Sequence, residues 1–395
     1  MRTLIAKLKR TIEPSDPLPQ AAEYENQADA LGVPDWDAGP AALVRSHVEW
    51  LKRAQDASTS KDGGVSRSYS LLTGWATSYP ETTGYIVPTL LDLAHRLGDQ
   101  DLRMRAHRML TWLASIQFPD GGIQGGKADA KPRVPVTFNT GQVLIGFAAG
   151  VKEFGDEFKR PMMLAATWLR DTLDADGCWR KHPTPFAKSG EKAYETHVSW
   201  GLFEAERVHA GEGFGAAGLR QIDWALTKQR ENGWIADCCL TDPSMPLTHT
   251  LGYALRGILE GYALSGEPRL LAAARRTADP LLSALRPDGF LPGRFRSTWQ
   301  PAADFACLTG TVQIAACWLI LFRATSDPRY LEGARRANSF VRRTVRVEGP
   351  SDIIGGVKGS FPVSGWYGAY EYLNWAAKFS IDSNLLEMDL QNACR

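Results

Sequence analysis

The amino-acid sequence has no excess of charge of either sign. Its 45 basic and 44 acidic side chains leave a formal net charge of +1 over 395 residues. A broad basic surface that would attract nucleic acid is therefore not expected. Charged residues make up 23% and hydrophobic residues 44% of the chain. This balance favours a folded protein with a large core over a disordered chain.

Cysteine is sparse, and its spacing fits no common metal site. The adjacent pair Cys238–Cys239 lacks the spacing of a zinc knuckle. Cys307 and Cys317 lie in an apolar helical stretch, where cysteine behaves as a small core residue. The glycine-rich segment 121–126 lacks the Lys and Ser/Thr of a phosphate-binding loop. We predict reduced cysteines, no metal ion and no cofactor.

Long hydrophobic runs are also missing from the N-terminal region. Its longest apolar run, Leu4-Ile5-Ala6, is too short for a secretory signal, and we expect no stretch of the chain to cross a bilayer. Leu4, Ile5, Leu8 and Ile12 share one helix face among basic residues, so residues 1–12 are a candidate for peripheral membrane contact. The expected location is cytoplasmic, either free or at the inner face of a membrane.

A repeat with a period near 56 residues is the strongest pattern that is present. A glycine-containing turn follows a helical stretch six times, with its first glycine at positions 63, 121, 177, 233, 289 and 355. The intervals are 58, 56, 56, 56 and 66 residues. Such regular spacing is typical of a repeated supersecondary unit.

Each repeat contains two helical stretches of different character. The stretch before a turn, such as 269–285, alternates polar and apolar residues at helical spacing, which suits an outer helix. The stretch after a turn, such as 308–315, opens with small or polar residues and is then apolar nearly all round, which suits a buried helix.

These stretches predict an all-α fold, an (α/α)6 toroid with little β-structure over residues 40–395. An open helical solenoid is the alternative, but its terminal repeat would be a polar cap, and the sixth inner stretch is as apolar as the others. Residues 1–39 are expected to form an N-terminal lead-in, which is extended and rich in Pro, Asp and Ala over residues 13–39.

The inner helices of such a toroid all run in the same direction. Their N-termini therefore meet at one face, with unpaired N–H groups and positive dipole ends. Polar residues occupy these helix starts and aromatic residues the loops before them, which predicts a binding site at this mouth. About half of the polar residues have an alternative interpretation as ordinary helix caps. The candidate catalytic residues are Glu81, Glu195, Glu371, His197, His249, Tyr367 and Tyr370. The candidate substrate-binding residues are Tyr85, Asn139, Gln142, Trp200, Trp234, Arg294, Trp299, Asp304, Gln313, Trp366 and Asn374.

Two groups of toroid proteins resemble this sequence. Gln117-Phe-Pro-Asp-Gly-Gly and Gln229-Arg-Glu-Asn-Gly-Trp resemble the Gln-x-x-x-Gly-Trp repeat of prenyltransferases and squalene cyclases, a likeness that runs over most of residues 40–380. The acidic motifs of that group are absent, so this resemblance implies the scaffold, with terpenoid-cyclase-like activity as an alternative. Segments 78–85 and 356–375 are similar to proteins associated with bacterial exopolysaccharide synthesis. The architecture resembles that of toroid glycoside hydrolases, uronate lyases and sugar epimerases.

The second resemblance implies an enzyme that cleaves or modifies a bacterial oligo- or polysaccharide. Glycoside hydrolysis, our first hypothesis, needs two carboxyl groups across the sugar bond. Its candidates at the mouth are Glu81, Glu195, Asp304 and Glu371.

A uronate C5-epimerase or polysaccharide lyase is the alternative, and it needs a base, an acid and a group that neutralises the sugar carboxylate. The candidates for acid and base are His197, His249, Tyr85, Tyr367 and Tyr370, and those for the cation are Arg294 and Arg296. A non-catalytic carbohydrate-binding role remains a further alternative. The sequence does not indicate the oligomeric state.

Overall fold

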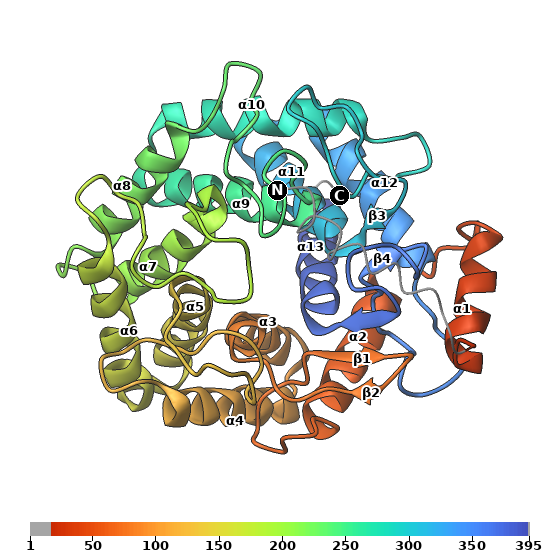
Figure 1. The fold of residues 1–395 in the computed structure, drawn as a ribbon, viewed down its shortest axis with the longest axis horizontal. Coiled ribbons are helices and arrows are strands. Elements are labelled where there is room, and N and C mark those ends of the chain that lie inside the picture. Colours follow the sequence, from red (N-terminus) through yellow and green to blue (C-terminus); the bar gives the residue numbers. More distant parts are fainter. Residues whose placement is uncertain (1–16, 394–395) are drawn as a thin grey trace, which may run out of the picture.

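The structure, a computed structural model, describes residues 17–393 and consists mainly of α-helices (Figure 1). The outer helices are α2 (Pro40–Asp56), α4 (Gln100–Ile116), α6 (Lys159–Thr172), α8 (Phe214–Leu226), α10 (Pro268–Ala284) and α12 (Pro328–Arg343). The inner helices are α3 (Pro80–Leu97), α5 (Thr137–Phe154), α7 (Thr196–Val208), α9 (Thr248–Ser265), α11 (Leu308–Thr325) and α13 (Asn374–Ala393). Each inner helix packs against the next, and α13 returns to α3. The predicted (α/α)6 toroid is therefore confirmed.

The two helix sets differ in burial as their sequences predict. In the outer helix α12, buried residues such as Tyr330, Ala334 and Val341 recur at helical spacing along one side. In the inner helix α11, every residue from Leu308 to Leu319 is buried. Among the described helices, α11 alone has the length and mean hydropathy, 1.3, of a membrane span, which we did not expect. Because 72% of α11 is buried inside the toroid, packing in the core accounts for its apolar character.

Glycines allow the inner helices to pack closely. A Cβ atom on Gly84 of α3 would lie 2.5 Å from the Cα atom of Val143 in α5. A Cβ atom on Gly201 of α7 would lie 2.5 Å from the carbonyl oxygen of Gly141 in α5. Any larger residue at these positions would push the helices apart, and the space that they enclose would change.

Each repeated turn packs against the next outer helix around the toroid. Gly233 has a φ of +82°, a conformation that residues with a Cβ atom rarely adopt. The position of a Cβ atom on Gly233 is taken by the carbonyl oxygen of Arg276 in α10. Gly355, in the last turn, meets the carbonyl oxygen of Ser46 in α2 in the same way. The last turn thus rests on the first outer helix and closes the toroid.

The glutamines before these turns have a related structural role. The side-chain amide of Gln229 donates a hydrogen bond to the carbonyl oxygen of Ala273 in α10 over 2.9 Å. The amide of Gln117 donates to the carbonyl oxygen of Pro161 in α6 over 3.0 Å. The Gln-x-x-x-Gly-Trp-like segments therefore link neighbouring outer helices. This structural role agrees with the resemblance to prenyltransferases and squalene cyclases, which implies the scaffold.

Short strands connect the loops at the mouth of the toroid. Strands β1 (Ser68–Ser70), β2 (Gly74–Trp75) and β5 (Glu371–Leu373) form an antiparallel sheet in the order β2-β1-β5. Strands β3 (Ala306–Cys307) and β4 (Ser360–Phe361) form a second antiparallel pair. Two 3-10 helices, η2 (Gly155–Phe158) and η3 (Ala193–Glu195), precede α6 and α7. The pairing of β1 with β5 brings the loop before α3 against the loop before α13.

A further helix, α1 (Gln20–Ala30), lies outside the toroid in a region that we predicted to be extended (Figure 1). Its buried side includes Glu25 and Asp29, which pair with the buried amino group of Lys358 at 3.0 and 2.5 Å. A helix that buries carboxylates has no apolar periodicity, so the pattern did not reveal it. Residues 1–12, the candidate membrane contact, lie outside the described residues.

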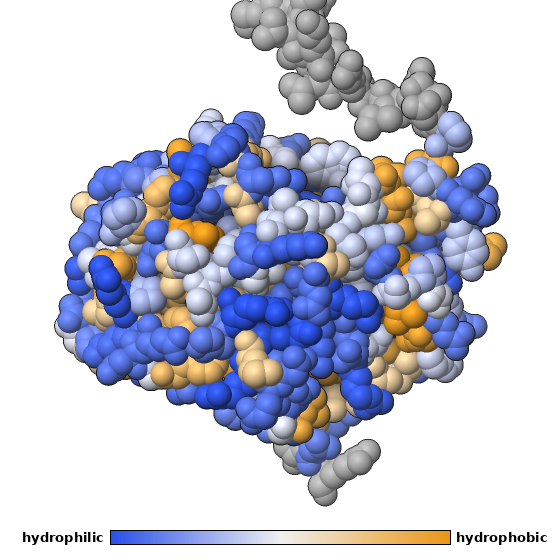
Figure 2. All heavy atoms as spheres, turned by 90° about the horizontal axis from the view of Figure 1, so that it is seen from below, coloured by the Kyte–Doolittle hydropathy of each residue, from blue (hydrophilic) through white to orange (hydrophobic). Residues whose placement is uncertain are grey.

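The outer surface follows from the amphipathic outer helices. Figure 2 views the toroid from one edge and shows hydrophilic side chains over most of that face. Apolar side chains appear there in small separate groups, as is usual for a protein surface.

Candidate functional site

A pocket with a volume of about 400 Å³ opens at the N-terminal ends of the inner helices. Its lining includes residues from the first turns of α3, α5, α9 and α13 and from η3, just before α7. We call it the central pocket. Four predicted residues line it, namely Glu81, Asn139, His249 and Tyr367.

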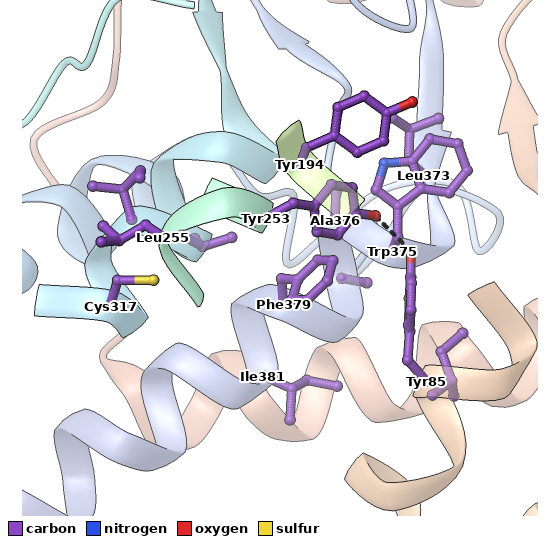
Figure 3. Close-up of a cluster of buried hydrophobic side chains, with 14 of the residues drawn as sticks. Tyr85, Tyr194, Tyr253, Leu255, Cys317, Leu373, Trp375, Ala376, Phe379 and Ile381 are labelled. Carbon is purple, nitrogen blue, oxygen red and sulfur yellow. Dashed lines mark hydrogen bonds between the residues drawn. The ribbon is translucent and has the colours of Figure 1, made fainter. Parts of the chain in front are cut away.

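Aromatic side chains form much of the wall and floor of the central pocket. Phe138 contacts the rings of Tyr194 and Tyr253, with centroids 5.3 and 5.0 Å apart. Figure 3 shows how Tyr194, Tyr253 and Trp375 converge from η3, α9 and α13. Such surfaces suit a ligand with apolar faces, and the phenolic hydroxyls provide polar contacts beside them.

Glu81 is the carboxyl group of the central pocket, and it lies in the first turn of α3. Pro80 starts this helix with a fixed φ, so the turn is well defined. The Tyr79 hydroxyl donates a hydrogen bond to Glu81 Oε2 over 2.9 Å. Burial raises the pKa of Glu81 to about 7, although the Tyr79 hydroxyl and the charge of Arg67 act in the opposite direction. Near neutral pH the side chain can therefore both give and accept a proton.

Arg67 links this carboxyl group to a second one. Its guanidinium pairs with Glu371 Oε2 over 2.8 Å across the β1–β5 sheet and lies over the ring of Trp375 at 5.1 Å. Arg67 and Trp375 line the central pocket, whereas Glu371 lies behind Arg67 and outside the lining. Glu371 thus has a direct cationic partner, whereas Glu81 has the Tyr79 hydroxyl as its hydrogen-bond partner.

His249 is the imidazole of the central pocket. Its Nδ1 atom lies 2.8 Å from Gln313 Oε1, an acceptor, so Nδ1 carries the proton and Nε2 keeps its lone pair. Burial lowers the pKa of His249 to about 4, so the ring is neutral at ordinary pH. The rings of Tyr253 and Tyr367 lie beside it, with centroids at 4.4 and 5.3 Å. Gln313, predicted to bind substrate, instead fixes the orientation of this histidine.

A second histidine–glutamine pair lies deeper in the toroid. His197 Nδ1 lies 2.6 Å from Gln142 Oε1, and both side chains are fully buried. The imidazole contacts Tyr253 and Trp200, and burial keeps its pKa well below the usual value. The Tyr85 hydroxyl, also buried, lies 3.5 Å from that of Tyr253. These predicted residues lie behind the pocket wall rather than in it.

The remaining predicted residues are dispersed around the mouth. Trp234 is buried against Trp299, whose indole N–H donates to the carbonyl oxygen of Asn232 over 2.8 Å. Asn374 is buried and donates from Nδ2 to the carbonyl oxygen of Ser66. Tyr370 and the exposed Asp304 lie outside the central pocket.

Arg294 and Trp366 form a separate unit at the rim. Trp366 is 61% exposed, and the guanidinium of Arg294 lies over its ring at 4.6 Å. Arg294 also donates to the carbonyl oxygen of Met245.

Glu195 lines a second pocket next to the first one.

Several lining residues were not predicted from the sequence. Tyr253 lies one helical turn after His249, so helical spacing would have found it. Trp375 follows Asn374 in the first turn of α13, so its position at the start of an inner helix would have predicted it. Arg67, Phe186 and Leu240 come from irregular segments and a strand edge, where no periodicity marks a position as facing the pocket.

Metal ligands are not grouped in the part of the chain that the structure describes. No set of three or more His, Cys, Asp or Glu side chains in residues 17–393 is arranged to hold a metal ion. The lining of the central pocket offers proton-transfer groups, aromatic rings, an arginine and a lysine.

Comparison with solved structures gives close matches to the whole toroid. An unsaturated glucuronyl hydrolase specific for heparin superposes with a TM-score of 0.71 at 14% identity, covering 89% of this chain and 97% of that one. The cellobiose 2-epimerase of Bacillus thermoamylovorans gives 0.69 at 11% identity, covering 88% and 97%. A D-mannose isomerase gives 0.71 at 10% identity, covering 90% and 99%. At these identities the likeness shows the (α/α)6 toroid fold. No protein-family model matches the chain, and no curated protein matches its sequence.

Proposed function

We propose that the protein is a carbohydrate-active enzyme of the glycoside hydrolase type, acting on an oligo- or polysaccharide with Glu81 as its general acid. The observation that carries this proposal is the state of Glu81 in the central pocket. Burial raises its pKa to about 7, and the Tyr79 hydroxyl holds the carboxyl group in place. A carboxylic acid that keeps its proton near neutral pH can protonate the oxygen of a glycosidic bond as that bond breaks.

Glu371 is the second carboxyl group in this proposal. Hydrolysis of a glycoside needs a protonated acid and an ionised carboxylate in one site. Arg67 contacts Glu371 directly and also lowers the pKa of Glu81, so it lies within electrostatic reach of both groups. Movement of Arg67 toward a bound substrate would open a path between Glu371 and the pocket.

The pocket also has features that suit a sugar. The rings of Phe138, Tyr253 and Trp375 offer flat apolar faces, and the buried Nδ2 atom of Asn139 has no hydrogen-bond partner in the described chain. A sugar hydroxyl would satisfy that amide. A volume of about 400 Å³ lies near the lower end of the range for ligand pockets, which favours the end of a chain over a long segment.

The structural neighbours support the same substrate class. Their names describe a glucuronyl hydrolase, a cellobiose epimerase, a mannose isomerase and an α-1,6-mannanase, all of which act on sugars. The toroid is thus compatible with hydrolysis as well as with epimerisation or isomerisation.

His249 supports a second candidate function, a sugar epimerase or lyase. Gln313 fixes the imidazole so that the unprotonated Nε2 is the ring nitrogen available to the pocket. An unprotonated Nε2 can remove a proton from a carbon next to a carbonyl or carboxylate, and Glu81 can return one. In this mechanism Arg67, which lines the same pocket, would neutralise a sugar carboxylate.

One experiment separates these functions. The purified protein is incubated with neutral and uronic-acid oligosaccharides, and three products are followed. New reducing ends without a conjugated double bond report hydrolysis, new reducing ends together with the absorbance of a conjugated double bond report elimination, and incorporation of solvent deuterium at carbon reports epimerisation. We expect new reducing ends, formed at a rate that falls as the pH rises through about 7.

The Glu81→Gln variant tests the role of the carboxyl group. We expect it to lose activity by about 10²–10⁴-fold with an unchanged melting temperature, because the amide keeps the shape but cannot donate the proton. Glu23→Gln, on the exposed side of α1, is the matched control and should keep full activity. Full activity in Glu81→Gln, or the absence of all three products, would refute the proposal.

A further inference from the structure

A second pocket, with a volume of about 310 Å³, lies beside the central pocket. Phe138, Thr184 and Tyr194 line both pockets, so the two share a wall. We call the second one the side pocket. Segment 179–195, which leads into α7, forms most of its lining. The two pockets are therefore adjacent, so one ligand of more than one sugar residue can be considered for both.

Glu195 contributes an unsatisfied polar atom to the side pocket. The residue is 6% exposed, and its Oε2 atom has no hydrogen-bond partner within residues 17–393. A buried carboxyl oxygen without a partner is costly, because it has lost its water and gained nothing in exchange. An occupant that makes a hydrogen bond to this atom would remove that cost.

The charges around the side pocket are unequal. Arg180 and Glu191 pair with each other at 2.6 Å, so they largely cancel. Lys188 and Lys192 also line the pocket, and neither forms an ion pair within the described chain. Lys192 is almost fully buried, and its amino group donates a hydrogen bond to the carbonyl oxygen of Cys239 over 3.3 Å. The side pocket therefore has spare positive charge.

We propose that the side pocket binds the sugar residue next to the one in the central pocket, and that it recognises a carboxylate on that residue through Lys192 and Glu195. This inference rests on the proposed function, since it takes the ligand to be a chain of sugars. The ammonium group of Lys192 would neutralise the ligand carboxylate, and the carboxyl proton of Glu195 would form a hydrogen bond to it. Trp179, Phe138 and Tyr194 would pack against the sugar ring.

The protonation state of Glu195 gives the recognition a pH dependence. Burial raises the pKa of Glu195 to about 8, against the opposing effect of Lys192. Below that pH the neutral carboxyl group can donate to a ligand carboxylate, and above it the two negative charges would repel each other. The other charged or titratable groups around Glu195 and Lys192 are Cys178, Arg180, His182, Lys188, Glu191, Tyr194, Asp237 and Cys239. His182, whose pKa burial lowers, is neutral throughout this range.

Calorimetric titration of the full chain with two disaccharides tests the proposal. Cellobiouronic acid carries one carboxylate, and cellobiose is its neutral counterpart. We expect the acid to bind about tenfold more tightly at pH 7, and Lys192→Met to reduce its affinity to that of cellobiose. Lys181→Met changes an exposed lysine of the same segment that does not line the pocket, and it should leave both affinities unchanged.

The pH series provides the specific readout. In the unmodified protein, affinity for the acid should fall as the pH rises from about 7 to about 9, while Glu195→Gln should bind it with little pH dependence in that range. Equal binding of both disaccharides, or a pH dependence that persists in Glu195→Gln, would overturn the proposal. Glu81→Gln should keep the preference for the acid. If Glu81→Gln is fully active but the preference is present, the mechanism of the proposed function fails and the side pocket stands.

Discussion

The Tyr79 hydroxyl and Glu81 Oε2 are joined by a 2.9 Å hydrogen bond across the first turn of α3. This bond stabilises the ionised carboxylate, so it holds the pKa of Glu81 lower than burial alone would. The two residues lie only two positions apart, so one turn supplies both the carboxyl group and the hydroxyl that lowers its pKa. The pH range of the proposed activity should depend on this contact.

Tyr79→Phe removes the hydroxyl and should raise the pKa of Glu81 further. If Glu81 acts as an acid, activity will persist to higher pH, and the alkaline limb of the pH–rate profile should move up by about one unit. Tyr24→Phe, on exposed α1, is the control. A limb that stays in place would show that another group controls the rate at alkaline pH.

Gln313→Leu should reveal whether His249 takes part in proton transfer. Without the acceptor at 2.8 Å, Nδ1 is no longer favoured as the protonated nitrogen, and the ring populates both neutral forms. Nitrogen NMR of the imidazole should show this change directly. An epimerase or lyase would lose activity by about 10-fold or more, whereas a hydrolase that relies on carboxyl groups would change little.

Gly233→Ala should destabilise the toroid through two separate effects. The residue has a φ of +82°, and its added methyl group would collide with the carbonyl oxygen of Arg276. We expect a loss of about 3 kcal/mol or more in the free energy of unfolding, measured by denaturant titration. Gly211→Ala also has a positive φ but open space around it, so it should cost only about 1 kcal/mol. Equal losses of stability in the two variants would mean that packing of the turn against α10 does not contribute to stability.

Lys358→Met should weaken the attachment of α1. The amino group of Lys358 neutralises Glu25 and Asp29, and all three side chains are buried. Its removal leaves the buried Asp29 without a cation and Glu25 with Arg346 as its remaining partner, at a cost of about 3–5 kcal/mol. Adding Glu25→Gln and Asp29→Asn to the same chain should recover part of that loss. No recovery would indicate that packing, rather than charge, holds the helix.

The sequence predicted the toroid well because its repeat depends on local rules. Each repeat has a turn glycine, an amphipathic stretch before it and an apolar stretch after it. All three features can be recognised in the sequence without knowledge of distant contacts. The helix α1 escaped the same reasoning because Lys358, the partner of its carboxylates, lies more than 300 positions away in the chain. Nothing near Glu25 or Asp29 signals a buried position.

The pocket was predictable only in part for a related reason. Glu81, Asn139 and His249 lie in the first turns of inner helices, where helix direction alone determines which face they reach. Arg67 lines the pocket because the pairing of β1 with β5 positions the segment that carries it, and Leu240 lines the pocket from a loop. Residues such as Asp304 and Trp299 lie in similar loops but turn elsewhere, because loop conformation depends on contacts that the sequence does not display.

The contact between the turn at Gly355 and Ser46 makes the two chain ends interdependent. In an open repeat protein, a terminal unit can fray while the others persist. Here the loss of α2 would also uncover α13, and the mouth would lose the support of β1 for Glu371. The protein should therefore unfold in a single cooperative transition, and a chain truncated at either end should lose the pocket together with the fold.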